Sequence, residues 1–480
     1  MKFNDSTAGK RWRWPLALLA VSLLALALRW YYVSTALVLQ PVRGDATQYV
    51  AYAWNLAQHA VFAKDAPGAA VIHPDNYRDP GYPLFLAIWM KWLGDGDAWY
   101  SAVLLCQAFL GALTVMLASQ LGRYWLPSRW AFAAGVLMAV WPHSITITSY
   151  LLSETLFGFL CVLAALLCAS AFRRESRLWA IFAGVVFGMA SLTNAMLLPF
   201  GVLLAIFFAW RRLARPGVCI VLAIGCILLP GAWAIRNAQI APPAAESSSL
   251  ARALQNLEQG SWPDFQFAWR QSAVGTPAAR IPAQVVLRQV DAEYQLLRSD
   301  PRLGAAALTG RFAQHPLRYA RWYLIEKPYL LWGWNIEIGQ GDIYVYPTAN
   351  SPFQTRPAWI ALAALCHALN LPLMLLGFAS AFLAWPARRP FASLEKPYSR
   401  ASFITVLALA AFVTAVYTSL QSEPRYSIPF RSFEILLAIT PLWAVARWWQ
   451  NNRRLSPRAS RQPSQVNHAD PPSSSSTPER

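Results

Sequence analysis

A set of charged and amide side chains stands beside the ends of the long apolar runs of this sequence. They come from separate stretches of the chain: Asp45, Arg78, Asp79, Glu154, Arg236, Asn237, Glu423 and Arg425. A carboxylate suits the removal of a proton from an attacking hydroxyl. A guanidinium suits a phosphate, because its planar fork contacts two oxygens. Any single charge at such a position is as often a solvated helix end, but together these groups could join a phosphate-bearing molecule to a polar acceptor.

The composition indicates a helical membrane protein. Of the 480 residues, 56% are hydrophobic and only 13% are charged, whereas a soluble protein carries about 25% charged residues. Several apolar runs approach the ~20 residues with which a helix crosses a bilayer. Tryptophans and tyrosines flank many of these runs, as interfacial anchors do. We therefore expect an all-α, polytopic protein, and we expect no disulfide framework, because the cysteines all lie inside apolar runs.

Basic clusters at the ends of the runs predict how the chain crosses the membrane. Such clusters lie at residues 10–13, 173–177 and 211–215. Since lysine and arginine favour the cytoplasmic side, the pattern predicts about ten spans with both termini cytoplasmic. The charged and amide groups named above then share the external side. The clusters also explain the net charge of +18, so we expect contact with membrane lipids and no nucleic-acid partner.

The runs divide the chain into parts. Residues 1–14 are predicted to be a cytoplasmic N-terminus, 15–237 an N-terminal transmembrane catalytic module with a first external loop at 41–97, 238–357 an external loop with amphipathic helices, 358–449 the C-terminal transmembrane helices, and 450–480 a disordered cytoplasmic tail. Within the first loop, the apolar piece 82–93 is too short to span and is expected to lie along the membrane surface.

The order of several short motifs resembles a known family. An Asp soon after the first run is followed by Arg-x-Pro-Gly-Tyr-Pro (78–83), Ser-Glu-Thr-Leu-Phe (153–157), Arg-Asn (236–237) and Arg-Tyr-x-x-Pro (425–429). Over about residues 10–450, this order resembles the bacterial GT-C glycosyltransferases related to protein O-mannosyltransferases and to lipid A aminoarabinose transferases. The resemblance implies a GT-C fold and an inverting transfer of sugar from a polyprenyl phosphate. It also implies an active site on the external, periplasmic face of a bacterial inner membrane.

The resemblance also implies roles for individual residues. In the family, the Asp of the first external loop is the base or orients the acceptor, and Asp45 stands in that position. Glu154 matches the second acidic position, where it would orient the acceptor or contact a metal or phosphate; a helix-terminal cap is an equal alternative. The donor-phosphate candidates are Arg78, Arg236, Arg425 and Lys327. The candidates for lining the groove are Tyr82, Asn237 and Tyr426.

Other functions fit the sequence less well. A transporter or flippase of lipid-linked sugars would place polar groups near the bilayer midplane in repeated halves, but no repeat is visible here. A non-catalytic scaffold derived from a transferase is a third possibility. We expect no required metal, because His73 and His315 do not form a ligand set, although a divalent ion stays open. Mannose, glucose, galactose and aminoarabinose donors all fit, as do protein, lipid A and glycan acceptors.

Overall fold

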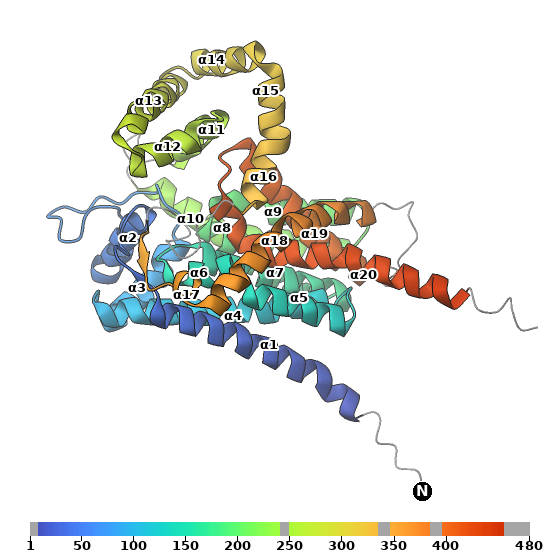
Figure 1. Cartoon of the computed structure of the whole chain (residues 1–480). Coiled ribbons are helices and arrows are strands. Elements are labelled where there is room, and N and C mark those ends of the chain that lie inside the picture. Colours follow the sequence, from blue (N-terminus) through green and yellow to red (C-terminus); the bar gives the residue numbers. More distant parts are fainter. Residues whose placement is uncertain (1–7, 241–248, 335–345, 385–395, 456–480) are drawn as a thin grey trace, which may run out of the picture.

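A bundle of long helices carries an arch of shorter helices on one side (Figure 1). The computed structural model describes residues 8–240, 249–334, 346–384 and 396–455. Most of these residues are helical. The strands in these ranges are β1 (Leu37–Val38) and β2 (Thr348–Ala349), which pair antiparallel with Leu37 opposite Ala349. The all-α prediction is confirmed.

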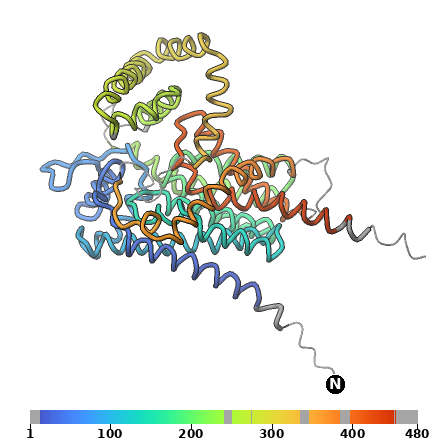
Figure 2. The backbone as a smooth tube through the Cα atoms, in the orientation of Figure 1, coloured from blue at the N-terminus to red at the C-terminus, as the bar shows by residue number. Residues whose placement is uncertain are grey.

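Seven helices in the described part of the chain are long and apolar enough to cross a membrane. They include α1 (Ala8–Thr35), α4 (Asp97–Gly122), α7 (Glu154–Arg174), α10 (Pro216–Gln239), α18 (Pro357–Ala379), α19 (Pro397–Ser419) and α20 (Arg431–Leu455). They run along the bundle in Figure 2, with the basic-flanked start of α1 and the end of α20 toward the same side. The chain is therefore a multi-pass membrane protein.

The remaining apolar segments are broken or short. Helix α5 (Ser128–Val140) continues into α6 (Pro142–Thr146) and the turn η1 (Ile147–Ser149) with a bend of 61°, which would make an eighth span. The continuous apolar run at 130–149 predicts one unbroken span, but Pro142 breaks it, because proline lacks the N–H that continues a helix. Helices α8 (Arg177–Thr193) and α9 (Phe200–Trp210) flank the turn η2 (Ala195–Leu197). The predicted count of about ten is reached only when the bent pair and both short helices are included.

Close helix packing in the bundle depends on small side chains. Helices α8 and α10 cross at Gly184 and Gly225. A Cβ on Gly184 would overlap the carbonyl oxygen of Leu222, and a Cβ on Gly225 would crowd the backbone of Ile181. Within a bilayer, such small residues let two backbones approach and gain van der Waals contact.

The first polar loop adds two helices at one end of the bundle. Helix α2 (Asp45–His59) packs against α3 (Gly81–Leu93), which is the apolar piece expected along the membrane surface. Tyr82, Leu86 and Trp99 form part of the buried cluster between α3 and α4. Helix α3 therefore connects the loop to the bundle and fixes the position of the residues just before it.

The arch consists of α11–α15. Its helices are α11 (Ser249–Ser261), α12 (Phe265–Val274), α13 (Pro277–Ser299), α14 (Pro301–Gln314) and α15 (Pro316–Arg321). Prolines open α13, α14 and α15, a position where the missing N–H costs nothing. The chain returns to the bundle through the π-turn η4 (Trp322–Glu326) and α16 (Lys327–Trp332). Helix α17 (Pro352–Thr355) precedes α18, and the 3-10 segment η7 (Pro424–Phe430) precedes α20.

Candidate active site

Asp45 is held between two arginines. Its Oδ1 lies 2.7 Å from Nη2 of Arg78, and its Oδ2 lies 2.8 Å from Nη2 of Arg425. The same Arg425 guanidinium also contacts a second carboxylate: its Nε lies 3.2 Å from Oε1 of Glu154. We call Asp45, Arg78, Glu154 and Arg425 the Asp45 cluster. The chain thus brings together four of the predicted site residues, one each from α2, the loop before α3, α7 and η7.

The turn before α2 sets the direction of Asp45. Gly44 has φ +56°, a backbone conformation in which side chains other than glycine are strained. The Tyr346 hydroxyl donates a 2.6 Å hydrogen bond to the carbonyl of Arg43 and accepts one of 3.4 Å from the N–H of Ala46. Tyr346 lies two positions before β2, the strand that pairs with β1. No local pattern in the sequence predicts this contact, which joins residues 303 positions apart.

Aromatic rings and an amide hold Arg78. Its Nε donates to Gln48, and its guanidinium lies 5.2 Å from the ring centre of Tyr49 and 5.7 Å from that of Tyr77. Tyr82 is fully buried under this group, where its ring meets Tyr49 edge-on at 5.1 Å. Its hydroxyl donates to Gln107. The expectation that Tyr82 lines an open groove is therefore corrected: Tyr82 supports Tyr49 from the core.

Glu154 and Arg425 are positioned by the contact between α7 and η7. Glu154 is the first residue of α7, and a Cβ on Gly158 would lie only 3.1 Å from the backbone of Pro429. Arg425 lies over the ring of Tyr426, which stacks on Tyr417 at 4.7 Å. The second carboxylate oxygen of Glu154 is buried and accepts no hydrogen bond from the described residues. A buried polar atom of this kind calls for a functional explanation.

The charges of the cluster reinforce one another. Burial alone would raise the pKa of Asp45, but the guanidiniums of Arg425 and Arg78 outweigh it and hold that pKa well below its usual range. Burial opposes the charge of Arg78, yet its interactions with Tyr49 and with the Asp45 carboxylate raise the pKa of Arg78 above its ordinary value. The Asp45 side chain keeps 27% of its surface exposed, so this paired, ionised carboxylate remains open to a ligand.

Among the described residues, Arg236 hydrogen-bonds to the first polar loop and to Asn237, and not to the Asp45 cluster. Arg236 donates to the carbonyls of Asp75 (2.7 Å) and Phe62 (3.3 Å) and to the side chain of Asn237 (3.0 Å). Asn237 therefore accepts from its neighbour and helps to fix the first polar loop. The phosphate-binding role of Arg236 and the groove-lining role of Asn237 stay predictions; in the structure, two loop carbonyls already accept hydrogen bonds from Arg236.

The Lys327 side chain also donates hydrogen bonds to backbone carbonyls. Its ammonium is fully buried and donates to the carbonyls of Gly260 (2.9 Å) and Leu420 (2.6 Å). The ring of Tyr323 lies 4.3 Å away from it. The expected contact between Lys327 and a phosphate is therefore corrected, since the structure leaves this ammonium no exposed face.

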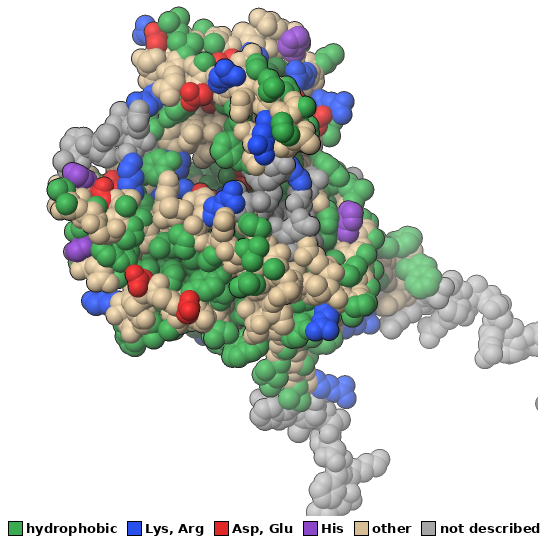
Figure 3. Space-filling model, turned by 60° about the vertical axis from the view of Figure 1, so that its left-hand side comes forward, with side chains coloured by type: hydrophobic (Ala, Val, Ile, Leu, Met, Phe, Trp, Pro, Cys, Tyr) green, Lys and Arg blue, Asp and Glu red, His purple; other side chains and the backbone are tan. Residues whose placement is uncertain are grey.

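The described part of the chain holds no group of three or more His, Cys, Asp or Glu side chains arranged around a metal position. In the cluster, both carboxylates face arginines. The space-filling view shows the molecule hollowed between the arch and the bundle, with acidic and basic side chains around the hollow (Figure 3).

The chain resembles membrane glycosyltransferases both in a family match and in its fold. Residues 73–233, about a third of the chain, match the family model described as dolichyl-phosphate-mannose-protein mannosyltransferase. This stretch includes Arg78 and Glu154 and ends just before Arg236. The resemblance predicted from the order of the motifs is therefore confirmed at the level of a GT-C, mannosyltransferase-like protein.

Solved structures show the same fold over most of the chain. The archaeal oligosaccharyltransferase AglB from Archaeoglobus fulgidus, in complex with an inhibitory peptide and a dolichol-phosphate, matches with 15% identity and a TM-score of 0.52, over 95% of this chain and 53% of its own. The Archaeoglobus fulgidus oligosaccharyltransferase tethered with an acceptor peptide matches with 14% identity and a TM-score of 0.52, over 93% and 51%. The chain thus spans about half the length of these structures.

ArnT from Cupriavidus metallidurans, bound to undecaprenyl phosphate, matches with 14% identity and a TM-score of 0.33, over 92% of this chain and 79% of its own. A search among curated proteins gave no match.

Proposed function

We propose that this protein is an inverting glycosyltransferase that moves a sugar from a polyprenyl phosphate to a hydroxyl or amine of a protein, lipid or glycan. The observation that carries the proposal is the half-buried Asp45 carboxylate between Arg78 and Arg425. One carboxylate and two guanidiniums are what this reaction needs: a proton acceptor and a site for a departing phosphate. The family match over residues 73–233 supports the same reaction class.

The donor phosphate takes its place beside Arg78 and Arg425. In the structure, each of these arginines directs one nitrogen to Asp45. A bound phosphate shares both positive charges and so weakens the pairing that keeps the pKa of Asp45 low. Asp45 therefore becomes a stronger base only when the donor is present, which protects the site from proton abstraction without a sugar to transfer.

The transfer is a single displacement. The acceptor oxygen or nitrogen attacks the anomeric carbon on the face opposite the phosphate, and Asp45 takes the acceptor proton. The bond between the anomeric carbon and the phosphate oxygen breaks, and the polyprenyl phosphate leaves with the electron pair. Guanidiniums preorganised around this oxygen stabilise the developing charge. The configuration at the sugar inverts, as in the single-displacement mechanism of glycoside hydrolysis.

Glu154 has two tasks in this scheme. Its Oε1 faces Nε of Arg425 at 3.2 Å and so orients that guanidinium. Its Oε2, which has no partner among the described residues, is free to accept a hydrogen bond from an acceptor or sugar hydroxyl. The basic clusters at the opposite ends of the spans support a site on the external face of a bacterial inner membrane.

The test is a comparison of cells with and without this chain. Mass spectrometry of lipids, glycans and proteins should show the loss of an increment equal to one sugar, which identifies the sugar class and the acceptor together. The purified protein should then transfer this sugar from a polyprenyl-phosphate donor with inversion at the anomeric carbon. Unchanged masses in all three fractions, or retention of configuration, would contradict the proposal.

A further inference from the structure

Helix α11 contacts the loop that carries Arg78 at one of its ends. Nη2 of Arg252 donates to both carboxylate oxygens of Asp79, at 3.0 and 3.1 Å, and the two side chains are only 20% and 22% exposed. Asp79 also accepts a 3.1 Å hydrogen bond from the N–H of Ala195, at the break between α8 and α9. Asp79 directly follows Arg78, so this pair fixes the backbone from which Arg78 extends.

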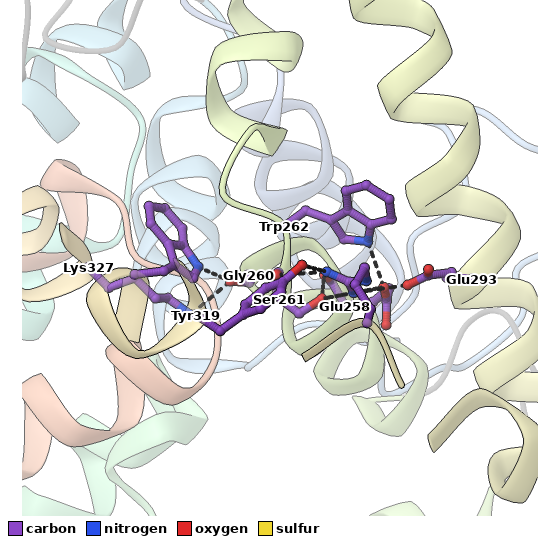
Figure 4. A network of polar contacts seen from close by, with 9 residues as sticks. Glu258, Gly260, Ser261, Trp262, Glu293, Tyr319 and Lys327 are labelled. Carbon is purple, nitrogen blue, oxygen red and sulfur yellow. Dashed lines mark hydrogen bonds and ion pairs between the residues drawn. The ribbon is translucent and has the colours of Figure 1, made fainter. Parts of the chain in front are cut away.

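The other end of α11 contacts the segment that leads to Arg425. Gly260 packs directly on Leu420, because a Cβ on Gly260 would overlap the carbonyl of Leu420. Lys327 joins the two backbones by donating to both carbonyls, and Trp322 donates a further 3.1 Å hydrogen bond to Gly260 (Figure 4). The segment after Leu420 is short and leads straight to η7, which begins at Pro424.

Helix α12 adds a second contact on the same segment. Nε2 of Gln266 donates a 3.0 Å hydrogen bond to Oε1 of Glu423, which also accepts one of 3.1 Å from Gln421. Glu423 lies two positions before Arg425. The arch is thus hydrogen-bonded both to the loop that carries Arg78 and to the segment that carries Arg425.

A buried polar network stiffens the end of α11. Arg311 on α14 donates to Glu258 (3.3 Å), to Glu293 (2.9 Å) and to both oxygens of Ser261. Its guanidinium also lies 4.2 Å from the ring centre of Trp262. Figure 4 shows these side chains beside the contacts of Lys327 and Gly260. These bonds tie the end of α11 to α13 and α14, so the end of α11 is a firm support for Leu420.

We propose that α11 is a positioning element that sets the distance between Arg78 and Arg425. Arg252 and Gly260 are the residues through which α11 holds the two segments that carry these arginines. This role presupposes the proposed function, because it concerns the two arginines assigned to the donor phosphate. In the part of the chain that the structure describes, neither Arg252 nor Gly260 bonds directly to a residue of the Asp45 cluster. Their effect on the donor therefore passes through Asp79, through the ring of Tyr77, which lies 5.8 Å from the Arg252 guanidinium, and through the segment from Leu420 to Arg425.

The test compares Arg252→Gln and Gly260→Ala with a matched control, Arg318→Gln. Arg318 makes an Arg–Asp pair of 2.8 Å with Asp264 in the same arch, but both side chains are more than half exposed. A displacement of about 1 Å at a reacting site can cost ~100-fold in rate. We expect a ~10- to 100-fold loss of kcat/KM for the donor in the two α11 variants, with the acceptor KM unchanged. The control should match the wild type, and Arg252→Lys should recover part of the loss.

A second measurement decides the proposal without any transfer assay. Hydrogen–deuterium exchange of residues 77–81 and 421–430 should rise in Arg252→Gln, and not in Arg318→Gln. Wild-type exchange in both segments of Arg252→Gln, or a wild-type kcat/KM for the donor in a folded sample of that variant, would overturn the role of α11. If the wild-type chain transfers no sugar at all, the proposed function fails, and the exchange measurement alone decides this proposal. Because Gly260→Ala can disturb folding, Arg252→Gln carries the decision.

Discussion

Nη2 of Arg425 lies 2.8 Å from Oδ2 of Asp45, although 380 positions separate the two residues in the chain. This pair joins the helix that follows the first span to the segment that precedes the last one. The bundle must therefore close before the site exists. The same pair also means that a donor phosphate has to divide an internal ion pair when it binds to Arg425.

Asp45→Asn should remove most of the transfer activity. A positioned general base contributes typically 10²–10⁴-fold, and the amide cannot take the acceptor proton. Transfer of a labelled sugar from a polyprenyl-phosphate donor would measure the loss, with size-exclusion chromatography to confirm the fold. The control is Asp95→Asn, since Asp95 is an exposed acid outside the cluster. Transfer at the wild-type rate by Asp45→Asn would exclude Asp45 as the base.

Arg78→Lys and Arg425→Lys should each weaken donor binding. A lysine keeps the charge but loses the fork that grips two oxygens, and a hydrogen bond to a charged group contributes about 1.5–3 kcal/mol. We expect the donor KM to rise by roughly tenfold or more on that scale, with a smaller change in the acceptor KM. Arg43→Lys is the control, because its exposed side chain lies outside the Asp45 cluster and donates a hydrogen bond to Gln40. A donor KM equal to that of the wild type in both variants would contradict phosphate binding.

Tyr346→Phe should loosen the turn before Asp45. The change deletes the hydroxyl that donates to the Arg43 carbonyl, a loss of about 1 kcal/mol. We expect a small fall in the thermal midpoint together with a clear fall in kcat, because the direction of Asp45 depends on this turn. The half-exposed Tyr329 offers the control Tyr329→Phe. Loss of stability with an unchanged kcat would show that the turn holds without Tyr346.

Lys327→Met should change how stability depends on pH. Burial lowers the pKa of Lys327 to about 7, while an unfolded lysine has a pKa of about 10.4. Between these values the unfolded chain binds more protons than the folded chain, so stability rises with pH across this window. The thermal midpoint of the variant should lose that rise between roughly pH 7 and pH 10. Its overall midpoint should also fall, because two carbonyls lose their donor. An equal pH slope in both proteins would show that Lys327 does not titrate in this range.

The sequence identified the cluster because its members sit in recognisable motifs. Asp45, Arg78, Glu154 and Arg425 each stand at a motif position beside an apolar run, and the fold brings these positions together. The all-helical fold followed from composition and run length. The side of the membrane on which the site lies and the roles of the individual residues stay predictions.

Other positions could not be assigned from local patterns. A lone cation at the end of a helix, such as Arg236 or Lys327, bonds to whichever carbonyls the tertiary fold presents to it. Contacts such as Tyr346 with Arg43 and Arg252 with Asp79 join distant segments. No periodicity or spacing within either segment marks them. The bend at Pro142 was missed because the apolar run around it is continuous.

The pairing of β1 with β2 has a consequence for fragments of this protein. Leu37 and Val38 meet Ala349 and Thr348, and Tyr346 beside them braces the turn that carries Asp45. A truncated chain that stops within the arch would keep Asp45, Arg78 and Glu154 but would lose both this brace and Arg425. Such a truncated chain would insert in the bilayer but would not be active. If the chain were divided between α10 and α11 and both pieces were produced together, activity would return only when the two pieces assemble with each other.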